Sequence, residues 1–316
     1  MWMLAVLLAM VGGLPPLDFL LPANEASGLV ASRRYAGVYY WLRDGGGSTP
    51  ATPRAALWAM RLSATGVPQA VRGHDLFPFY RTPGVSNMDW EALTIDGDGS
   101  IWIGAIGANN CVNQQRLYRF AEPDPSLDSA LELEAEYTIR FPDNPRAGCT
   151  TYNSEAMFWL DGHLYLVAKT HGSPVYRVDL PPAMAGEARL VRLGELGHGV
   201  DNISVAGLSD DRSRLVVADH KNIWVYASSD PQLCGDAYVV DVISRPHRWQ
   251  TNFAPNGAAV EGGTFVRDSY AVAFVSEDRR VYYATPKDYV GPEYRESAHR
   301  APVIVDRTCE DGEVSV

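Results

Sequence analysis

Short runs in which apolar and polar residues alternate fill most of the chain, and such runs are typical of β-strands. Three successive stretches each contain four of them: WEALTID, SIWIGAIG, RLYRFAE and AEYTIRFP; SEAMFWLD, HLYLVAK, PVYRVDL and ARLVRLG; ISVAGLSD, RLVVADH, NIWVYAS and AYVVDVI. Turn-forming pairs such as Asp161-Gly162 separate the runs. No convincing helical period lies between them, which argues against alternating strand and helix folds and favours an all-β protein.

The first run of each stretch resembles the others, and two further copies extend the series to five. The copies are NEASGLVAS (24–32), MDWEALTID (88–96), NSEAMFWLD (153–161), NISVAGLSD (202–210) and NGAAVEGGTFV (256–266). Their equivalent positions are Ser27, Glu91, Glu155, Ser204 and Glu261, separated by 64, 64, 49 and 57 residues, with 55 residues after the last. A β-sandwich would not explain so long a period, and six repeats would require splitting one of them. We therefore predict a five-bladed β-propeller of four-stranded antiparallel blades.

The N-terminus begins with an uncharged apolar run, MWMLAVLLAMVGGL, and the first basic residue is Arg33. The run has the length of a signal-peptide core and is too short to span a bilayer. Val11 and Gly13 form a small-residue cleavage pattern, but the basic segment that usually precedes such a core is missing, so a buried N-terminal strand is the alternative. We assign residues 1–22 to a signal peptide or N-terminal segment and 23–316 to a single propeller domain. The expected location is secreted or periplasmic, with no stable membrane span.

Composition limits the classes of partner. Hydrophobic residues make up 46% of the chain and charged residues 21%, which fits a globular, turn-rich protein. The net charge is −11 and no basic stripe is visible, which argues against binding of a nucleic acid polymer. The acidic balance is compatible with a cation ligand, although an acidic surface also simply maintains solubility. We expect a monomer that binds a small anionic molecule or a glycan.

The four cysteines, Cys111, Cys149, Cys234 and Cys309, form no CxxC pair or Cys/His cluster, so a zinc site is not favoured. Their even number suits an oxidising compartment, and three full pairings are open. Cys111 and Cys149 fall in loops that should share one face of neighbouring blades, which favours a disulfide between them. Cys234 and Cys309 then pair by default.

The repeated glutamates predict a cation site. The first strand of every propeller blade lines the central channel, so Glu91, Glu155 and Glu261 should converge near the axis. Like charges so close, partly buried, would raise each pKa steeply without compensation. None of the three is followed by a basic residue that could pair locally. Ca²⁺ accepts about six to eight oxygen ligands, and Ser27 and Ser204 could supply hydroxyl or main-chain oxygens. Mg²⁺ is less favoured because it retains its waters, and the alternative is that each glutamate is solvated or caps a turn.

The order Ser27, Glu91, Glu155, Ser204, Glu261 resembles the calcium-ligand order of the calcium-activated nucleotidase (apyrase) family, which has one ligand per blade. The segments DWEALTIDGDGSIWIGAIG (89–107), NSEAMFWLDGHLYLVA (153–168) and NISVAGLSDDRSRLVVA (202–218) also resemble that family and uncharacterised bacterial secreted propellers. The resemblance covers the inner two strands of each repeat. It implies a five-bladed propeller with one central calcium, whereas it indicates activity only weakly, because function depends on the site and not on the fold.

The loops between second and third strands should surround the same opening. From them we select seven candidate ligand-binding residues: Arg43, Asp44, Asn109, Lys169, His171, His220 and Arg279. The resemblance implies carboxylate and basic groups here, with Lys169 where the family has basic residues and Asp44 near its acidic turn. The family's denser arginine content in the third blade is absent, which puts nucleotide specificity in doubt. Polar loop residues are also commonly only solvated.

No GxSxG elbow, HExxH motif or P-loop is present, so serine-hydrolase and zinc-protease chemistry have no support. Two functions follow. The first is a calcium-dependent hydrolase acting on a phosphorylated or otherwise anionic small molecule. The second is a non-catalytic module in which calcium is structural and the rim binds a glycan or a protein. Lactone or ester hydrolysis is a third, less favoured, hypothesis. No residue is assigned a catalytic role from sequence.

Overall fold

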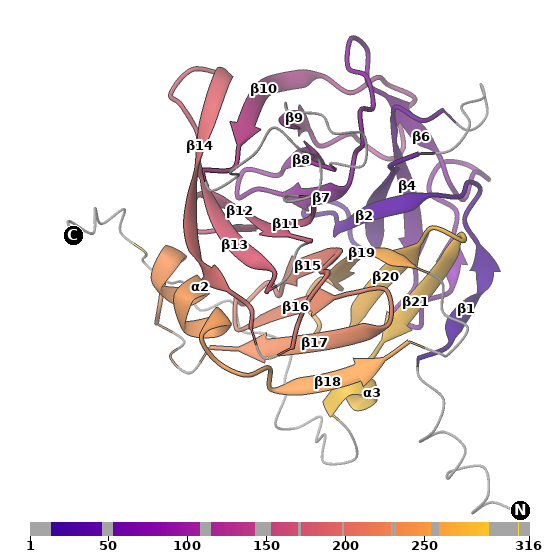
Figure 1. The fold of residues 1–316 in the computed structure, drawn as a ribbon. Coiled ribbons are helices and arrows are strands. Elements are labelled where there is room, and N and C mark those ends of the chain that lie inside the picture. The colour runs from indigo at the N-terminus through magenta and orange to yellow at the C-terminus, as the bar shows by residue number, and fades with distance from the viewer. Residues whose placement is uncertain are drawn as a thin grey trace, which may run out of the picture.

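The computed structural model describes residues 14–45, 53–107, 115–142, 153–169, 172–197, 199–228, 230, 232–253, 259–290 and 309. Its strands form five antiparallel groups, which we call units 1 to 5 in the order of their inner strands (Figure 1). Unit 1 contains β2 (Ala26–Ala31), β3 (Val38–Arg43), β4 (Ala56–Leu62), β5 (Pro68–Gln69) and β6 (Phe79–Arg81). Unit 2 contains β7 (Ala92–Ile95), β8 (Ser100–Ala105), β9 (Gln115–Ala121) and β10 (Leu133–Arg140).

The remaining units follow the same antiparallel pattern. Unit 3 contains β11 (Ser154–Leu160), β12 (His163–Ala168), β13 (Pro174–Asp179) and β14 (Ala185–Glu195). Unit 4 contains β15 (Val205–Leu208), β16 (Arg214–Ala218), β17 (Asn222–Ala227) and β18 (Trp249–Asn252). Unit 5 contains β19 (Val260–Phe265), β20 (Val272–Ser276), β21 (Arg280–Ala284) and, from the start of the chain, β1 (Pro16–Leu20).

The first strands of the units form a closed ring. β2 contacts β7, β7 contacts β11, β11 contacts β15, β15 contacts β19, and β19 contacts β2. These strands come from the five segments recognised as repeats, so the predicted repeat positions and the mainly β composition are confirmed. The arrangement is propeller-type, with the outer strands of each unit directed away from the ring (Figure 1).

The sheets differ from five separate four-stranded blades in two places. Units 2 and 3 join into one eight-stranded sheet, because β10 pairs in parallel with the 11-residue strand β14. In unit 1 the edge is divided, since both β5 and β6 pair with β4. Paired outer edges leave fewer unpaired N–H and C=O groups for association with other chains.

One predicted strand is wrong. The segment AYVVDVI lies within helix α2 (Gly235–Ile243), and the outer strand of unit 4 is β18 instead. The buried residues of α2 are Tyr238, Val239, Val242 and Ile243. This spacing is one face of a helix, and α2 packs against β14 and β17. Tertiary packing thus overrides the β-propensity of the valines. A second, short helix, α3 (Pro286–Val290), lies against β18 and β21.

The N-terminal strand completes unit 5. β1 pairs antiparallel with β21, with Pro16 opposite Tyr282 and Leu20 opposite Arg280. Residues 16–20 therefore belong to a sheet, although they lie within the segment 1–22 that we set apart from the propeller domain. The apolar run before Gly13 lies outside the described residues. Cleavage after Gly13 would leave β1 complete.

One of the two predicted disulfides is described. Cys234 and Cys309 are bonded, with Cα atoms 6.0 Å apart and a sequence separation of 75 residues. Cys234 is the residue before helix α2, so the bond attaches the C-terminal region to unit 4. Cys111 and Cys149 lie outside the described residues, and their pairing stays a prediction.

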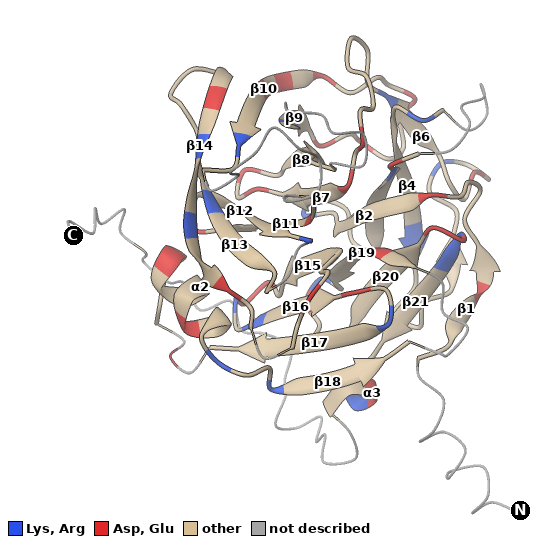
Figure 2. Ribbon diagram, viewed as in Figure 1, with Lys and Arg blue, Asp and Glu red and all other residues tan. Residues whose placement is uncertain are grey.

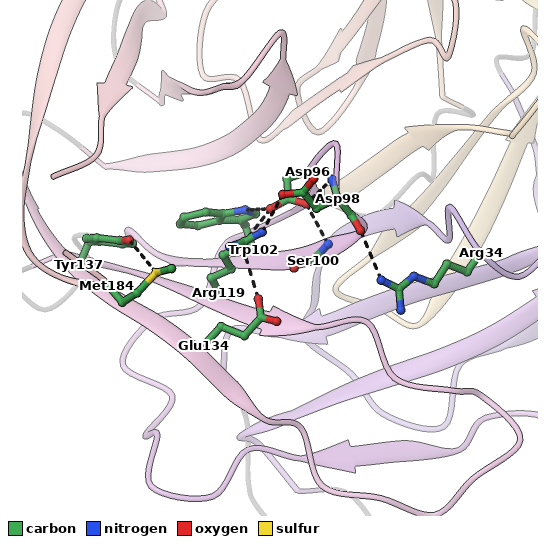
Figure 3. A network of polar contacts seen from close by, with 9 residues as sticks. All are labelled: Arg34, Asp96, Asp98, Ser100, Trp102, Arg119, Glu134, Tyr137 and Met184. Carbon is green, nitrogen blue, oxygen red and sulfur yellow. Dashed lines mark hydrogen bonds and ion pairs between the residues drawn. The ribbon is translucent and has the colours of Figure 1, made fainter. Parts of the chain in front are cut away.

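A polar network fixes the turn between β7 and β8. Asp96 accepts hydrogen bonds from the main-chain N–H groups of Asp98 (3.0 Å) and Ser100 (2.8 Å), from Trp102 Nε1 (3.0 Å) and from Arg119 Nε (2.9 Å) (Figure 3). Asp96 is buried, and its carboxylate is fully engaged by these donors. The turn that begins with Asp96-Gly97 is therefore held by its own first carboxylate.

Basic and acidic residues are mixed over the described elements, with no basic stripe along any one of them (Figure 2). Among the described residues no helix combines the length and apolar character needed to cross a bilayer.

Candidate functional site

The five repeat positions lie at the start of the inner strands, at one end of the ring. All are buried, with exposed fractions of 0–3%. Ser27, Glu155 and Glu261 lie within β2, β11 and β19, and Glu91 and Ser204 immediately precede β7 and β15. Each of the five residues belongs to a different unit, so all five units contribute to this end of the ring. We call this region the acidic end of the ring.

Local irregularities in the strands direct two of the glutamates. In β11 the pairing register shifts between Ser154 and Ala156, and in β19 between Val260 and Gly262. Glu155 and Glu261 are the residues at these shifts. A β-bulge re-aims the side chain of the extra residue and is common beside functional sites.

The residue two positions before the repeat position often has a left-handed backbone. Glu25 has φ of 59°, Asp89 of 75° and Asn202 of 55°. Such conformations are uncommon for residues other than glycine and cluster at functional sites, because surrounding structure must hold them. Three units therefore enter the ring through the same strained turn.

A lysine and a histidine neutralise part of the acidic end. Lys169 Nζ forms ion pairs with Glu155 and, at 3.4 Å, with Glu261 Oε1. His220 Nε2 lies 2.8 Å from Glu261 Oε1 and 3.2 Å from Lys169 Nζ. Asn153 donates a hydrogen bond of 2.7 Å to Glu155. The expectation that the glutamates lack basic partners holds only along the sequence, because Lys169 reaches them from the loop after β12.

The other half of the acidic end contains Asp44 and Glu91, which form no ion pair with a basic residue among the described residues, beside Glu261. Ligand oxygens of Asp44, Glu91 and Glu261 all lie within 4.8 Å of one another. Glu91 Oε1 and Asp44 Oδ1 are buried and accept no hydrogen bond from the described part of the chain. A second group, Glu25, Asp44 and Glu277, is equally compact. Asp44 belongs to both groups and links them.

This crowding changes the acidity of the carboxyl groups. Burial, followed by the negative charges of Glu261 and Glu25, raises the pKa of Asp44 to about 7. Burial and Glu261 raise the pKa of Glu155 to about 7 in spite of Lys169. Burial together with Glu155 and Asp44 raises the pKa of Glu91 well above its usual range. Groups that titrate near neutral pH in a buried site are typical of functional centres.

The two serines join neighbouring units. Ser27 Oγ donates a hydrogen bond of 2.8 Å to the main-chain oxygen of Glu91 and lies 3.2 Å from Glu91 Oε2. Ser204 Oγ donates to the main-chain oxygen of Val260 at 2.6 Å. Each serine hydrogen is used in a bond to the next unit, while the hydroxyl oxygen retains lone pairs.

The predicted rim residues fall into two sets. Asp44, Lys169 and His220 belong to the acidic end as described above. Arg43 is buried, and its guanidinium donates to the main-chain oxygen of Asn24 at 2.8 Å. Arg279 donates to the main-chain oxygen of Leu21 at 2.5 Å. These two arginines attach the end of β3 and the turn after β20 to the segment between β1 and β2. Asn109 and His171 lie outside the described residues.

Two residues of the acidic end, Glu25 and Asp89, were not expected from the sequence, whereas Glu277 lies in the loop SEDRR (276–280), which was expected to border the same opening. Glu25 and Glu277 form the second carboxylate group with Asp44, and Asp89 lies beside Glu91. Gly107 approaches so closely that a Cβ there would lie 2.3 Å from Asp89 Oδ2 and 2.6 Å from Glu91 Oε1. Position two before the repeat residue was a usable signal, because Glu25 and Asp89 both occupy it.

The chain has no recognisable relative in sequence, and the solved structures that it matches are only distantly similar. No family model matches the sequence, and no curated protein matches it. Among solved structures, a catalytically inactive virginiamycin B lyase from Staphylococcus aureus with quinupristin has a TM-score of 0.38 and 10% identity, over 83% of this chain and 67% of that one. A gluconolactonase from Xanthomonas campestris has a TM-score of 0.37 and 13% identity, over 85% and 77%. Neither supports an inference about activity, and neither links the chain to the nucleotidases.

The raised pKa values predict how stability depends on pH. In the unfolded chain these carboxyl groups titrate near pH 4, so between about pH 4 and pH 7 the folded state binds more protons. The free energy of unfolding, measured with urea in a chelator, should therefore fall as pH rises through that window. Asp44→Asn should flatten the dependence. A stability that rises across the same window in the wild-type protein would contradict the assignment.

Proposed function

We propose that the chain is an exported five-bladed β-propeller that binds Ca²⁺ at the acidic end of the ring and hydrolyses a phosphorylated or otherwise anionic small molecule there. The observation that most directly supports a bound cation concerns Glu91 Oε1, a buried carboxylate oxygen that accepts no hydrogen bond from the described residues. Buried charges are normally paired or bound to a metal. Asp44 and Glu261 complete a set of hard oxygen donors, which suits Ca²⁺.

The ligands that we propose are not simply the five repeat residues. Glu91, Asp44 and Glu261 would hold the ion directly, and Ser27 and Ser204 would hold the units in register around it. Glu155 is compensated by Lys169, so it would contribute after a shift of the lysine or through water. The ion would replace the positive charge that this half of the site lacks, and it would act as a Lewis acid toward an anionic substrate.

Lys169 and His220 support the hydrolase proposal. Burial opposes the charge of Lys169, but Glu155 and Glu261 together raise its pKa, so the ammonium group is charged at neutral pH. The hydrogen bond to Glu261 also raises the pKa of His220, whose side chain is 40% exposed. Lys169, and His220 when it is protonated, would bind the anionic group of a substrate. In the reaction, water supplies its hydroxyl to phosphorus and its proton to the leaving oxygen.

Export rests on the apolar N-terminal run and on the disulfide. The Cys234–Cys309 bond suits an oxidising compartment. Mass spectrometry of the secreted protein, which identifies the mature N-terminus, tests the proposal. A protein that stays inside the cell with residues 1–13 still attached would contradict it.

The cation proposal is tested by calcium-dependent stability. Ca²⁺ at about 100 times its Kd should raise the free energy of unfolding by about 2.7 kcal/mol, because only the folded state holds the ligands together. Glu91→Gln should abolish most of this increase. Glu134→Gln is the matched control, since Glu134 lies on β10 beside Arg119, outside the acidic end. Equal calcium stabilisation of Glu91→Gln and the wild type would exclude Glu91 as a ligand.

Hydrolysis is tested separately with nucleoside diphosphates and phosphate monoesters, in calcium and in chelator. Turnover that depends on calcium and falls in Lys169→Met would support the enzyme. If calcium stabilises the protein while none of these substrates turns over, the second function applies: a non-catalytic propeller in which calcium is structural and the rim binds a glycan or protein.

A further inference from the structure

A cavity lies at the end of the ring opposite to the acidic end. It has a volume of about 410 Å³, within the range of about 300–1,000 Å³ that is usual for small-molecule sites. Its wall comes from the far ends of the inner strands β2, β7, β11, β15 and β19 and from the turns that follow them. None of the residues proposed for the cation borders it. We call it the basal pocket.

The charged wall of the basal pocket is balanced. It contains three arginines and three aspartates: Arg33, Arg212, Arg267, Asp161, Asp210 and Asp268. Arg212 forms an ion pair with Asp161, whose other oxygen accepts the main-chain N–H of Gly235 at 2.9 Å. Arg267 donates to the main-chain oxygen of Arg33 and lies 3.7 Å from Asp268. Four of the six charged groups are therefore committed to each other or to the main chain.

The other two, Arg33 and Asp210, face the pocket from units 1 and 4, which do not adjoin in the ring. The charge of Asp210 acts to raise the pKa of Arg33, and the charge of Arg33 acts to lower the pKa of Asp210. The two side chains form no ion pair with each other. Among the described residues, the guanidinium of Arg33 has no hydrogen-bond or ion-pair partner. Asp210 accepts one hydrogen bond, from the main-chain N–H of Asp268 at 2.7 Å. A donor fork and an acceptor thus remain open across the pocket.

One wall of the pocket is apolar and firmly supported. Trp159 borders the pocket and stacks on Trp102 with ring centroids 6.2 Å apart, and Trp102 stacks in turn on Tyr137 at 6.0 Å. Asp96 and Arg119 hold Trp102 in place (Figure 3). Trp159 therefore presents a partly exposed aromatic surface whose position is fixed from behind. Phe158 and Leu208 extend the apolar wall.

We propose that the basal pocket binds a neutral polyhydroxylated molecule, a small sugar. Hydroxyl groups can accept a hydrogen bond from Arg33 and donate one to Asp210, whereas a net anion would be repelled by Asp210 and a cation by Arg33. The apolar face of a sugar ring matches the wall at Trp159. This site is independent of the cation proposed for the acidic end.

The experiment uses the full-length protein and saturation-transfer NMR with neutral sugars (glucose, galactose, mannose, xylose and maltose). Glucuronate and glucosamine serve as charged analogues of one ring. At least one neutral sugar should bind saturably, with an affinity that changes little with salt, and glucuronate and glucosamine should bind more weakly. Arg33→Gln and Asp210→Asn should each weaken binding by about tenfold or more.

The adjacent Arg34→Gln is the matched control, because Arg34 lies outside the pocket, 3.6 Å from Glu122, and should bind like the wild type. Binding of none of the neutral sugars, stronger binding of a charged analogue, or unchanged binding in Arg33→Gln would each overturn the proposal. Calcium-dependent stability of the Arg33 and Asp210 variants should match the wild type, so failure here is distinguishable from failure at the acidic end.

Discussion

Lys169→Met should lower the free energy of unfolding of the calcium-free protein by about 3–5 kcal/mol, because it leaves the buried Glu155 without an ion-pair partner and Glu261 with His220 alone. The side chains of Glu155 and Glu261 are only 3–4% exposed, and Lys169 is their shared partner. Urea denaturation in chelator measures the loss. Added calcium should restore part of it, since the cation would supply the missing charge.

Two further measurements make the prediction specific. Lys221→Met is the control, because the Lys221 side chain is exposed and forms no ion pair within the described part of the chain. The defect of Lys169→Met should shrink as pH falls, because protonation of the glutamates removes the unpaired charges. A Lys169→Met protein as stable as Lys221→Met at neutral pH would contradict the ion-pair network.

Gly262→Ala should destabilise the protein by at least about 3 kcal/mol, at the upper end of the usual cost of overpacking. A Cβ at Gly262 would lie 2.6 Å from the main-chain carbon of Gly28 and 2.8 Å from the nitrogen of Leu29. These atoms belong to β2, the neighbouring inner strand. Its main chain cannot shift easily, because β2 also packs against β7 in the closed ring. The substitution would therefore force β19 and β2 apart.

Gly97→Ala is the matched control, because its Cβ would meet only Trp159 Nε1 at an ordinary 3.7 Å. We expect a change within about 0.5 kcal/mol there. Thermal and urea unfolding compare the two variants. Near-equal stability of Gly262→Ala and Gly97→Ala would show that the inner strands are more loosely packed than described.

The positions of the inner strands could be predicted because their signal is repeated. A small or polar residue, then Ser or Glu, then an apolar run recurs five times, and one ambiguous copy is corrected by the others. The outer strands carry no such redundancy. AYVVDVI is apolar on both its helical and its extended face, so only the contacts of α2 with β14 and β17 decide its conformation.

The sequence was sufficient to predict which glutamates meet at the acidic end, but it did not reveal which basic residues neutralise them. The inner-strand positions of Glu91, Glu155 and Glu261 follow from the repeat. Lys169 follows β12 in sequence, and its ion pair with Glu261 crosses 92 residues of chain, so no local pattern reveals it. Convergence of charges from separate units depends on side-chain reach, which a one-dimensional pattern does not contain.

The basal pocket was not predicted at all. Its wall consists of turn residues such as Arg33 and Asp210, which look like ordinary solvated loop positions in sequence. Only the ring brings units 1 and 4 to the same opening. The sequence therefore indicated one end of the ring, and the structure adds the other.

The pairing of β1 with β21 has a consequence for synthesis of the chain. β1 is synthesised about 260 residues before its partner β21, so it must remain unpaired while units 1 to 4 form. Closure of so distant a contact is expected to be slow, and until then β20 and β21 expose a free sheet edge. Nascent chains halted before residue 280 contain β1 without its partner and should therefore be prone to aggregate. In a separate experiment, chains that lack β1 should be rescued by a peptide of residues 14–22, which would pair with β21.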